Sequence, residues 1–224
     1  MNITEKIIAR ASKKNTVSPG DVVFANVDKL MIHDVSGPGV IKVFEEWSKK
    51  GIRLEKVWNA DRIWVSEDHF VPSADRISAE NITKLTDWAK KFGIKKHFKY
   101  GLGQYGICHT LSHEEALVLP GEFYIGGDSH TNTTGALGAL AVGLGHTDIA
   151  YAMMHGRIWL KVPETMLFKL VGKKPPHIMA KDIILNIISD IGTDGANYKT
   201  MEFAGNAVSE MSMEERLTLT NMTT

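Results

Sequence analysis

The chain has 224 residues, of which 43% are hydrophobic and 23% are charged. This composition is typical of a folded globular protein and too apolar for intrinsic disorder. The 26 basic residues balance the 26 acidic residues, so no net charge attracts nucleic acid or anionic lipid. No apolar run reaches the length of about 18 residues that a membrane span needs. We therefore expect neither a nucleic-acid partner nor a membrane.

A single cysteine, Cys108, excludes an intrachain disulfide bond and favours a reducing compartment. The first residues, MNITEKIIARASKK, lack the apolar core of a signal peptide. These two features predict a cytoplasmic protein.

Helical and extended patterns alternate along the first 100 residues. Residues 2–13 and 40–49 carry apolar side chains at helical spacing, whereas residues 21–26 (DVVFAN) and 62–66 (RIWVS) are short and β-branched, as strands are. Residues 78–92 predict a helix that Ser78 caps and Gly93 ends, and residues 94–100 predict a strand.

The second half of the chain continues this alternation. Residues 122–127 (EFYIGG) predict a strand, and residues 135–160 are mostly small and apolar, with glycines that allow close packing of backbones. After a change of composition near Pro163, residues 165–176 resemble a strand and turn, and residues 180–191 a helix that ends at Gly192. We predict an α/β fold with a largely parallel sheet and a domain boundary near residue 162.

Four groups of polar residues lie at or near the ends of the predicted strands. They contain His33, the pair Asp68-His69, His109, and the run from Asp128 through Ser129 to His130. Since ligands bind at the carboxyl ends of parallel strands, we expect His33, His69, His109 and His130 to converge on one cleft. Each group alone also fits a turn beside a surface histidine, and Asp128-Ser129 fits a helix N-cap. Four groups together favour a site, because buried histidine–carboxylate pairs need partners.

Three other motifs carry little weight. Residues 101–106 match GxGxxG, but the helix after them has to stop before Pro120, which is too short for a dinucleotide-binding unit. His109 and His113 have the spacing of zinc ligands, but Thr110 stands where HExxH requires glutamate. Ser129 lies in no GxSxG motif, which argues against an α/β-hydrolase.

Residues 126–145 are more specific than any of these motifs. GGDSHT at residues 126–131 and TGALGALAVGLG at residues 134–145 strongly resemble the signature of the aconitase superfamily, in which DSHT precedes a glycine-rich helix. Pro120-Gly121, Asp68-His69 and the segment from Gly106 to His109 match in order and spacing, as do residues 159–165, residues 181–185 and Gly195. The subgroup that the chain resembles most comprises the large subunits of 3-isopropylmalate dehydratase and homoaconitase, and the resemblance extends from Ile3 onward.

This resemblance implies a three-layer α/β/α domain over residues 1–162 and part of a second α/β domain over residues 163–224. It also implies a hydro-lyase that dehydrates and isomerises a 2- or 3-hydroxy dicarboxylate such as 3-isopropylmalate. Because hydroxide is a poor leaving group, enzymes of this family use a [4Fe-4S] cluster as a Lewis acid together with a general acid. By position, the catalytic residues correspond to Asp68, His69, His109, Asp128 and His130, and the substrate-binding residues to His33, Ser129 and Asn221.

The chain also departs from the family pattern. The three cluster cysteines of the family come after the position of residue 224, and Cys108 alone cannot hold a cluster that needs at least three thiolates. We therefore expect no metal ligand in this chain, and activity only when the rest of the large subunit and a small swivelling-domain subunit join it. Asn132 and Thr220 stand where relatives often carry cysteine, and we interpret both as packing changes.

Two alternative functions stay open. The chain could be a non-catalytic, truncated paralogue that binds a dicarboxylate or a partner chain, or a hydrolase with a single metal ion at His69, His109 and His130. The sequence does not determine the hydroxy acid, because isopropylmalate, homocitrate, methylmalate and dimethylmalate differ in one alkyl or carboxyl group.

Overall fold

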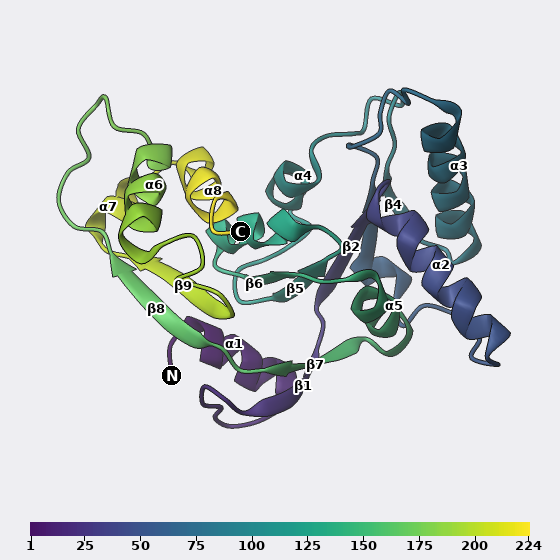
Figure 1. Cartoon of the computed structure of the whole chain (residues 1–224), viewed down its shortest axis with the longest axis horizontal. Coiled ribbons are helices and arrows are strands. Elements are labelled where there is room, and N and C mark those ends of the chain that lie inside the picture. Colours follow the sequence, from purple (N-terminus) through teal and green to yellow (C-terminus); the bar gives the residue numbers. More distant parts are fainter.

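A five-stranded parallel sheet forms the centre of the protein, for which a computed structural model describes all of residues 1–224 (Figure 1). The strand order is β4-β3-β2-β5-β6. The strands are β2 (Lys29–His33), β3 (Ile63–Ser66), β4 (Lys96–Phe98), β5 (Phe123–Gly126) and β6 (Leu140–Gly143). All four neighbouring pairs are parallel, which confirms the predicted α/β fold.

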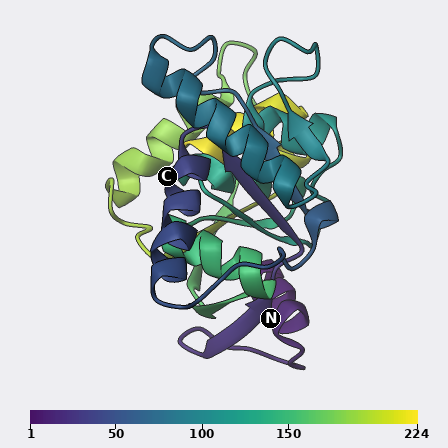
Figure 2. The same ribbon diagram turned by 90° about the vertical axis from the view of Figure 1, so that its right-hand side faces the viewer.

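Helices cover both faces of this sheet. On one face, in front in Figure 2, lie α2 (Ser36–Lys49), α3 (Arg76–Lys91) and α5 (His146–His155). They pack on the side chains of Leu30 and Ile32 in the main hydrophobic core. On the other face, α4 (Cys108–Glu114) and the 3₁₀ segment η2 (Ser129–Leu137) pack near Met31 in a smaller core. The side chains of β2 thus alternate between two cores, as expected for a strand that is buried on both faces.

The predicted strand at residues 21–26 forms, but outside the central sheet. It is β1 (Val22–Asn26), which pairs antiparallel with β7 (Arg157–Lys161) beneath α1 (Ile3–Ser12). The central strand is instead β2, which was not predicted as a strand. A short 3₁₀ turn, η1 (Ala60–Arg62), leads into β3.

The family signature implied a glycine-rich helix after residue 131, and this prediction is wrong. This region contains η2, then β6, and a helix only from His146 onward. Gly138 adopts a left-handed conformation (φ 76°), and a side chain at Gly143 would lie 2.3 Å from the backbone oxygen of Asp128. Glycine also disfavours helix by about 1 kcal/mol relative to alanine, so pairing with β5 prevails.

The predicted helix at 78–92 begins two residues early, because its cap is Asp75 rather than Ser78. The Asp75 carboxylate accepts the backbone N–H of Ser78 at 2.7 Å. The helix ends at Lys91, before Gly93 in the left-handed conformation.

The C-terminal segment forms a smaller α/β unit. The strands β8 (Glu164–Lys169) and β9 (Lys199–Ala204) pair in parallel, and the helices are α6 (Ala180–Ile191), α7 (Asn206–Glu210) and α8 (Met213–Asn221). The strand β9 and the helices α7 and α8 were not predicted. The predicted domain boundary falls between β7 and β8, and the division into two domains stays a prediction. None of the helices combines the length and apolarity required to cross a membrane.

Candidate active site

The predicted site residues come from the carboxyl ends of neighbouring strands. His33 is the last residue of β2, Asp68 and His69 follow β3, and Asp128 follows β5. His109 lies in the first turn of α4, which reaches the same edge after the loop from β4. Since these strands are adjacent and parallel, their ends meet.

Asp128 lies at the centre of the four predicted histidines. One carboxylate oxygen is 2.8 Å from Nε2 of His109 and 4.0 Å from Nδ1 of His130. The other oxygen is 3.4 Å from Nε2 of His33 and 3.7 Å from Nε2 of His69. The four histidines converge as predicted, and Asp128 is the group that they share; that they line one substrate cleft stays a prediction.

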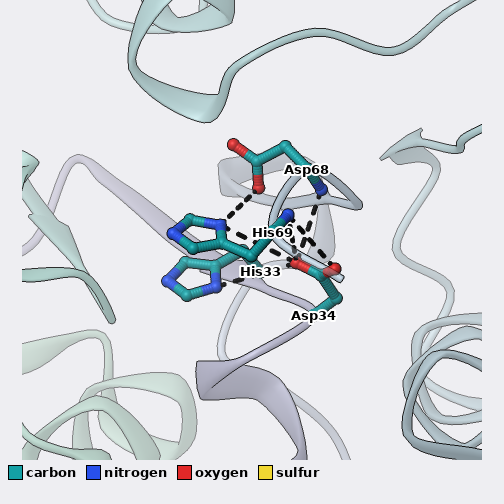
Figure 3. A group of neighbouring side chains, drawn as sticks. All are labelled: His33, Asp34, Asp68 and His69. Atoms are coloured by element: carbon teal, nitrogen blue, oxygen red, sulfur yellow. Dashed lines mark hydrogen bonds and ion pairs between the residues drawn. The ribbon is translucent and has the colours of Figure 1, made fainter. Parts of the chain in front are cut away.

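His33 is oriented by the backbone that follows it. Its Nδ1 accepts N–H groups from Val35 at 3.1 Å and Ser36 at 3.4 Å. The ring proton is therefore on Nε2, which faces Asp128. The ring of His33 is almost fully buried and stacks on that of His69 with centroids 4.1 Å apart (Figure 3).

His69 lies between two carboxylates. Its Nδ1 is 2.9 Å from Asp68, and its Nε2 faces Asp128. These contacts, first with Asp128 and then with Asp68, raise the pKa of His69 to about 10. The side chain remains 37% exposed. At neutral pH the site thus presents an imidazolium to solvent.

The same contacts stabilise both carboxylates in the ionised form. The pKa of Asp128 lies well below its usual range because of His109, then His33 and His69. Burial alone would raise the pKa of Asp68, but hydrogen bonds from His69 and from the backbone N–H of Cys108 outweigh it and lower the pKa. Two anionic side chains therefore flank the His69 imidazolium.

Ser129 and His130 lie at the exposed side of the cluster. The backbone N–H of His130 donates to Asp128 at 2.7 Å, and the hydroxyl of Ser129 is 3.1 Å from Nδ1 of His130. The His130 side chain is 47% exposed. Asp128 is also the N-cap of η2, which confirms the capping interpretation, while its role in catalysis stays a prediction.

Asn221, near the end of α8, has a different environment. Its amide donates to the hydroxyl of Thr133 at 2.8 Å, and not to any of the four histidines. Asn132 and Thr220 also join α8 to η2: the Asn132 amide donates to the backbone oxygen of Thr220 at 3.0 Å. Asn221 therefore lies against the segment that carries Ser129, and its role in binding substrate stays a prediction.

Two buried carboxylates beside the site, Asp34 and Glu67, were not predicted as site residues. Asp34 has a fully buried side chain that accepts backbone N–H groups of the loop carrying His69. Glu67 faces His97 at 2.8 Å and accepts the backbone N–H of Tyr100. Each is adjacent in sequence to a residue that was singled out, but nothing in the sequence shows which way these side chains point.

One group of side chains has its ligand atoms close enough for a metal ion. The atoms of His33, Asp34, Asp68 and His69 lie within 4.8 Å of one another (Figure 3). The Asp34 carboxylate already accepts hydrogen bonds from backbone N–H groups, and Nδ1 of His33 accepts two others. Hydrogen bonds therefore hold this cluster together. The metal-ion set of His69, His109 and His130 is not among the possible ligand groups.

The residues of this chain also do not fit an iron–sulfur cluster. Cys108 is the only cysteine, and its side chain is fully buried against Trp64 and Tyr124. Burial and the neighbouring Asp68 raise the pKa of its thiol above the ordinary range. A buried, protonated thiol is a poor iron ligand, and no second one is present.

The chain matches the profile of the Aconitase family (aconitate hydratase) over residues 5–224. The chain belongs to this family. It is 46% identical to the 3-isopropylmalate dehydratase large subunit of Aquifex aeolicus over 222 residues, which covers 99% of this chain and 50% of that protein.

Relatives from other organisms show similar sequence identity and coverage. The chain is 44% identical to the chloroplastic 3-isopropylmalate dehydratase large subunit of Arabidopsis thaliana, covering 99% of this chain and 45% of that protein. It is 45% identical to the 3-isopropylmalate dehydratase large subunit 1 of Pyrococcus abyssi, covering 99% and 51%. The chain thus spans about half the length of the curated relatives it matches.

Proposed function

We propose that this chain provides part of the active site of a hydro-lyase that acts on 3-isopropylmalate or a close analogue. The observation that carries the proposal is the shared Asp128 carboxylate, which joins His33, His69 and His109 at the ends of neighbouring strands. The family match and the names of the relatives favour this function over a binding module or a hydrolase.

In the proposed reaction, His69 supplies the proton that leaves with the hydroxyl group as water, and the proton on the neighbouring carbon passes to a base from the remainder of the enzyme. Its pKa of about 10 keeps it protonated at neutral pH. Transfer to hydroxide is still favourable, since the pKa of water is about 15.7. Asp68 and Asp128 hold the imidazolium from its two ring nitrogens. The exposed Ser129 and His130 are then placed to bind a carboxylate of the substrate.

The [4Fe-4S] cluster that the resemblance implies would be held by residues outside this sequence. Cys108 does not fit it, so we assign no step to the cluster on this chain. The chain contributes acid–base and substrate-binding groups. The cytoplasmic location also stays part of the proposal.

Two features support further polypeptide partners, which we propose to be the remainder of a large subunit and a small subunit. Parallel strands are normally covered on both faces, yet β8 and β9 contain no fully buried residue. A groove of about 1250 Å³ lies beside β9 and is lined also by segments of β6, β7 and α8. Further chain packed here would bury the exposed side chains of Trp159 and Tyr198.

Co-expression with candidate reading frames for the second half and the small subunit tests the proposal. The complex is expected to dehydrate 3-isopropylmalate or one analogue from a hydroxy-dicarboxylate panel, measured by alkene absorbance. Asp128→Asn in the same complex should abolish most of this activity. An assembled complex that binds a dicarboxylate but turns over none of the panel would support the non-catalytic alternative instead.

A further inference from the structure

Asp34 lies next to the histidine cluster but has no part in the proposed chemistry. It directly follows β2, and its side chain is 0% exposed. A buried carboxylate is costly unless hydrogen-bond donors surround it. Asp34 has such donors, and they come from a single loop (Figure 3).

Three consecutive backbone N–H groups donate to this carboxylate. Asp68 donates to Oδ1 at 3.4 Å, His69 donates to both oxygens at 3.1 and 3.2 Å, and Phe70 donates to Oδ2 at 2.5 Å. Hydrogen bonds to an ionised acceptor are about twice as strong as neutral ones. One side chain on β2 therefore holds the loop that follows β3.

We propose that Asp34 is a positioning residue, which fixes residues 68–70 so that the His69 ring reaches Asp68 and Asp128 at the same time. The catalytic consequence rests on the proposed function, whereas the structural consequence does not. His69 contacts the two carboxylates through opposite ring nitrogens, at 2.9 and 3.7 Å. A small shift of the loop therefore breaks at least one contact.

Asp34→Asn removes the acceptor charge and turns an NH₂ group toward backbone N–H donors. We expect the His69 pKa to fall from about 10 toward the ordinary histidine value of 6.5, measured by NMR titration of the ring. In an active complex, kcat should fall about 100-fold with little change in KM, because a displacement near 1 Å has that effect on catalysis.

Asp28→Asn is the matched control. Asp28 precedes β2 as Asp34 follows it, and its carboxylate also accepts a backbone N–H, from Phe123 at 2.8 Å. It pairs with Arg10 and Arg62, away from the histidines. Asp28→Asn should lower the melting temperature without changing the His69 pKa or kcat. Equal effects of the two variants would overturn the proposal.

Asp34→Glu separates position from charge, since Asp34 also lies 3.8 Å from Nδ1 of His69. Glutamate keeps the charge but displaces the carboxylate by one methylene in a fully buried site. We expect a lowered His69 pKa in this variant too. Recovery of the wild-type pKa and kcat by glutamate would show that Asp34 acts by charge alone.

Hydrogen exchange on the wild-type protein keeps the inference testable if neither variant folds. The amides of His69 and Phe70 should exchange at least tenfold more slowly than exposed amides of the same loop region. Unprotected exchange at both amides would refute the anchoring. An inactive wild-type complex would contradict the proposed function, while the NMR and exchange results would still decide the role of Asp34.

Discussion

Asp128→Asn is the most direct test of the charge arrangement at the site. The substitution keeps the size of the side chain and its capping oxygen but removes the negative charge that His33, His69 and His109 share. His69 keeps its second partner, Asp68, at 2.9 Å. The change therefore isolates the contribution of one carboxylate.

The expected effect on His69 follows from the distance of 3.7 Å between its Nε2 and Asp128. Two unit charges at this distance interact by about 4.5 kcal/mol at an effective dielectric constant of about 20. The His69 side chain is 37% exposed, so solvent screening reduces this to roughly 2 kcal/mol. At about 1.4 kcal/mol per pKa unit, the His69 pKa should fall by about 1.5.

NMR titration of the ring measures this change, and steady-state kinetics of an active complex measure its consequence. We expect kcat to fall about 100-fold or more and KM to change little, because the carboxylate matters most while protons move. An unchanged His69 pKa would refute the charge argument. Equal losses in kcat and in substrate affinity would remove Asp128 from the catalytic residues.

Further predictions concern pH, packing and the thiol. The pKa of His69 in the folded protein lies above 6.5, so its ion pairs stabilise the fold fully below pH 6.5, and this stabilisation is lost as pH rises toward 10. Urea titrations should therefore show a free energy of unfolding that declines over this pH range. In the variant His69→Gln the free energy of unfolding should depend less on pH. Gly143→Ala places a methyl group against the backbone of Asp128 and should lower the free energy of unfolding by about 1–3 kcal/mol. At Gly145 an added methyl group meets nothing within 4 Å, so Gly145→Ala should change the free energy of unfolding by less than about 0.5 kcal/mol. Similar losses in both would refute the packing argument. Cys108 should resist iodoacetamide at pH 8 until the protein unfolds, as judged by mass spectrometry, since it is buried with a raised pKa; rapid native labelling would contradict this. With iron and sulfide the chain alone should stay colourless, and broad absorbance near about 400 nm would indicate a thiolate-held cluster after all.

The sequence alone determined the α/β fold class and named the polar residues that the structure brings together around Asp128, whose catalytic roles stay predictions. The alternation of strands and helices reflects local periodicity, which each segment carries in its own side chains. The polar groups near the strand ends, from His33 to His130, converge because parallel strands place their carboxyl ends at one edge. These inferences needed no knowledge of distant contacts.

Tertiary structure decided what periodicity leaves open. Four of the five residues of β2 are buried, on both faces of the sheet, which gives no alternating pattern. In contrast, residues 22–26 alternate between exposed and buried, as an edge strand does. Residues 140–143 form a strand rather than a helix because β5 lies alongside and the backbone of Asp128 leaves no room for a side chain at Gly143.

Tertiary structure also decides which side chains pair within the site. Asp128 pairs with His33 and His69, which lie at or near the ends of other strands, and with His109, which lies 19 residues away on α4. Asp34 likewise reaches the His69 loop, 35 residues away in sequence. The sequence names these residues or their neighbours, but only the packing of β2 between β3 and β5 determines which carboxylate faces which imidazole.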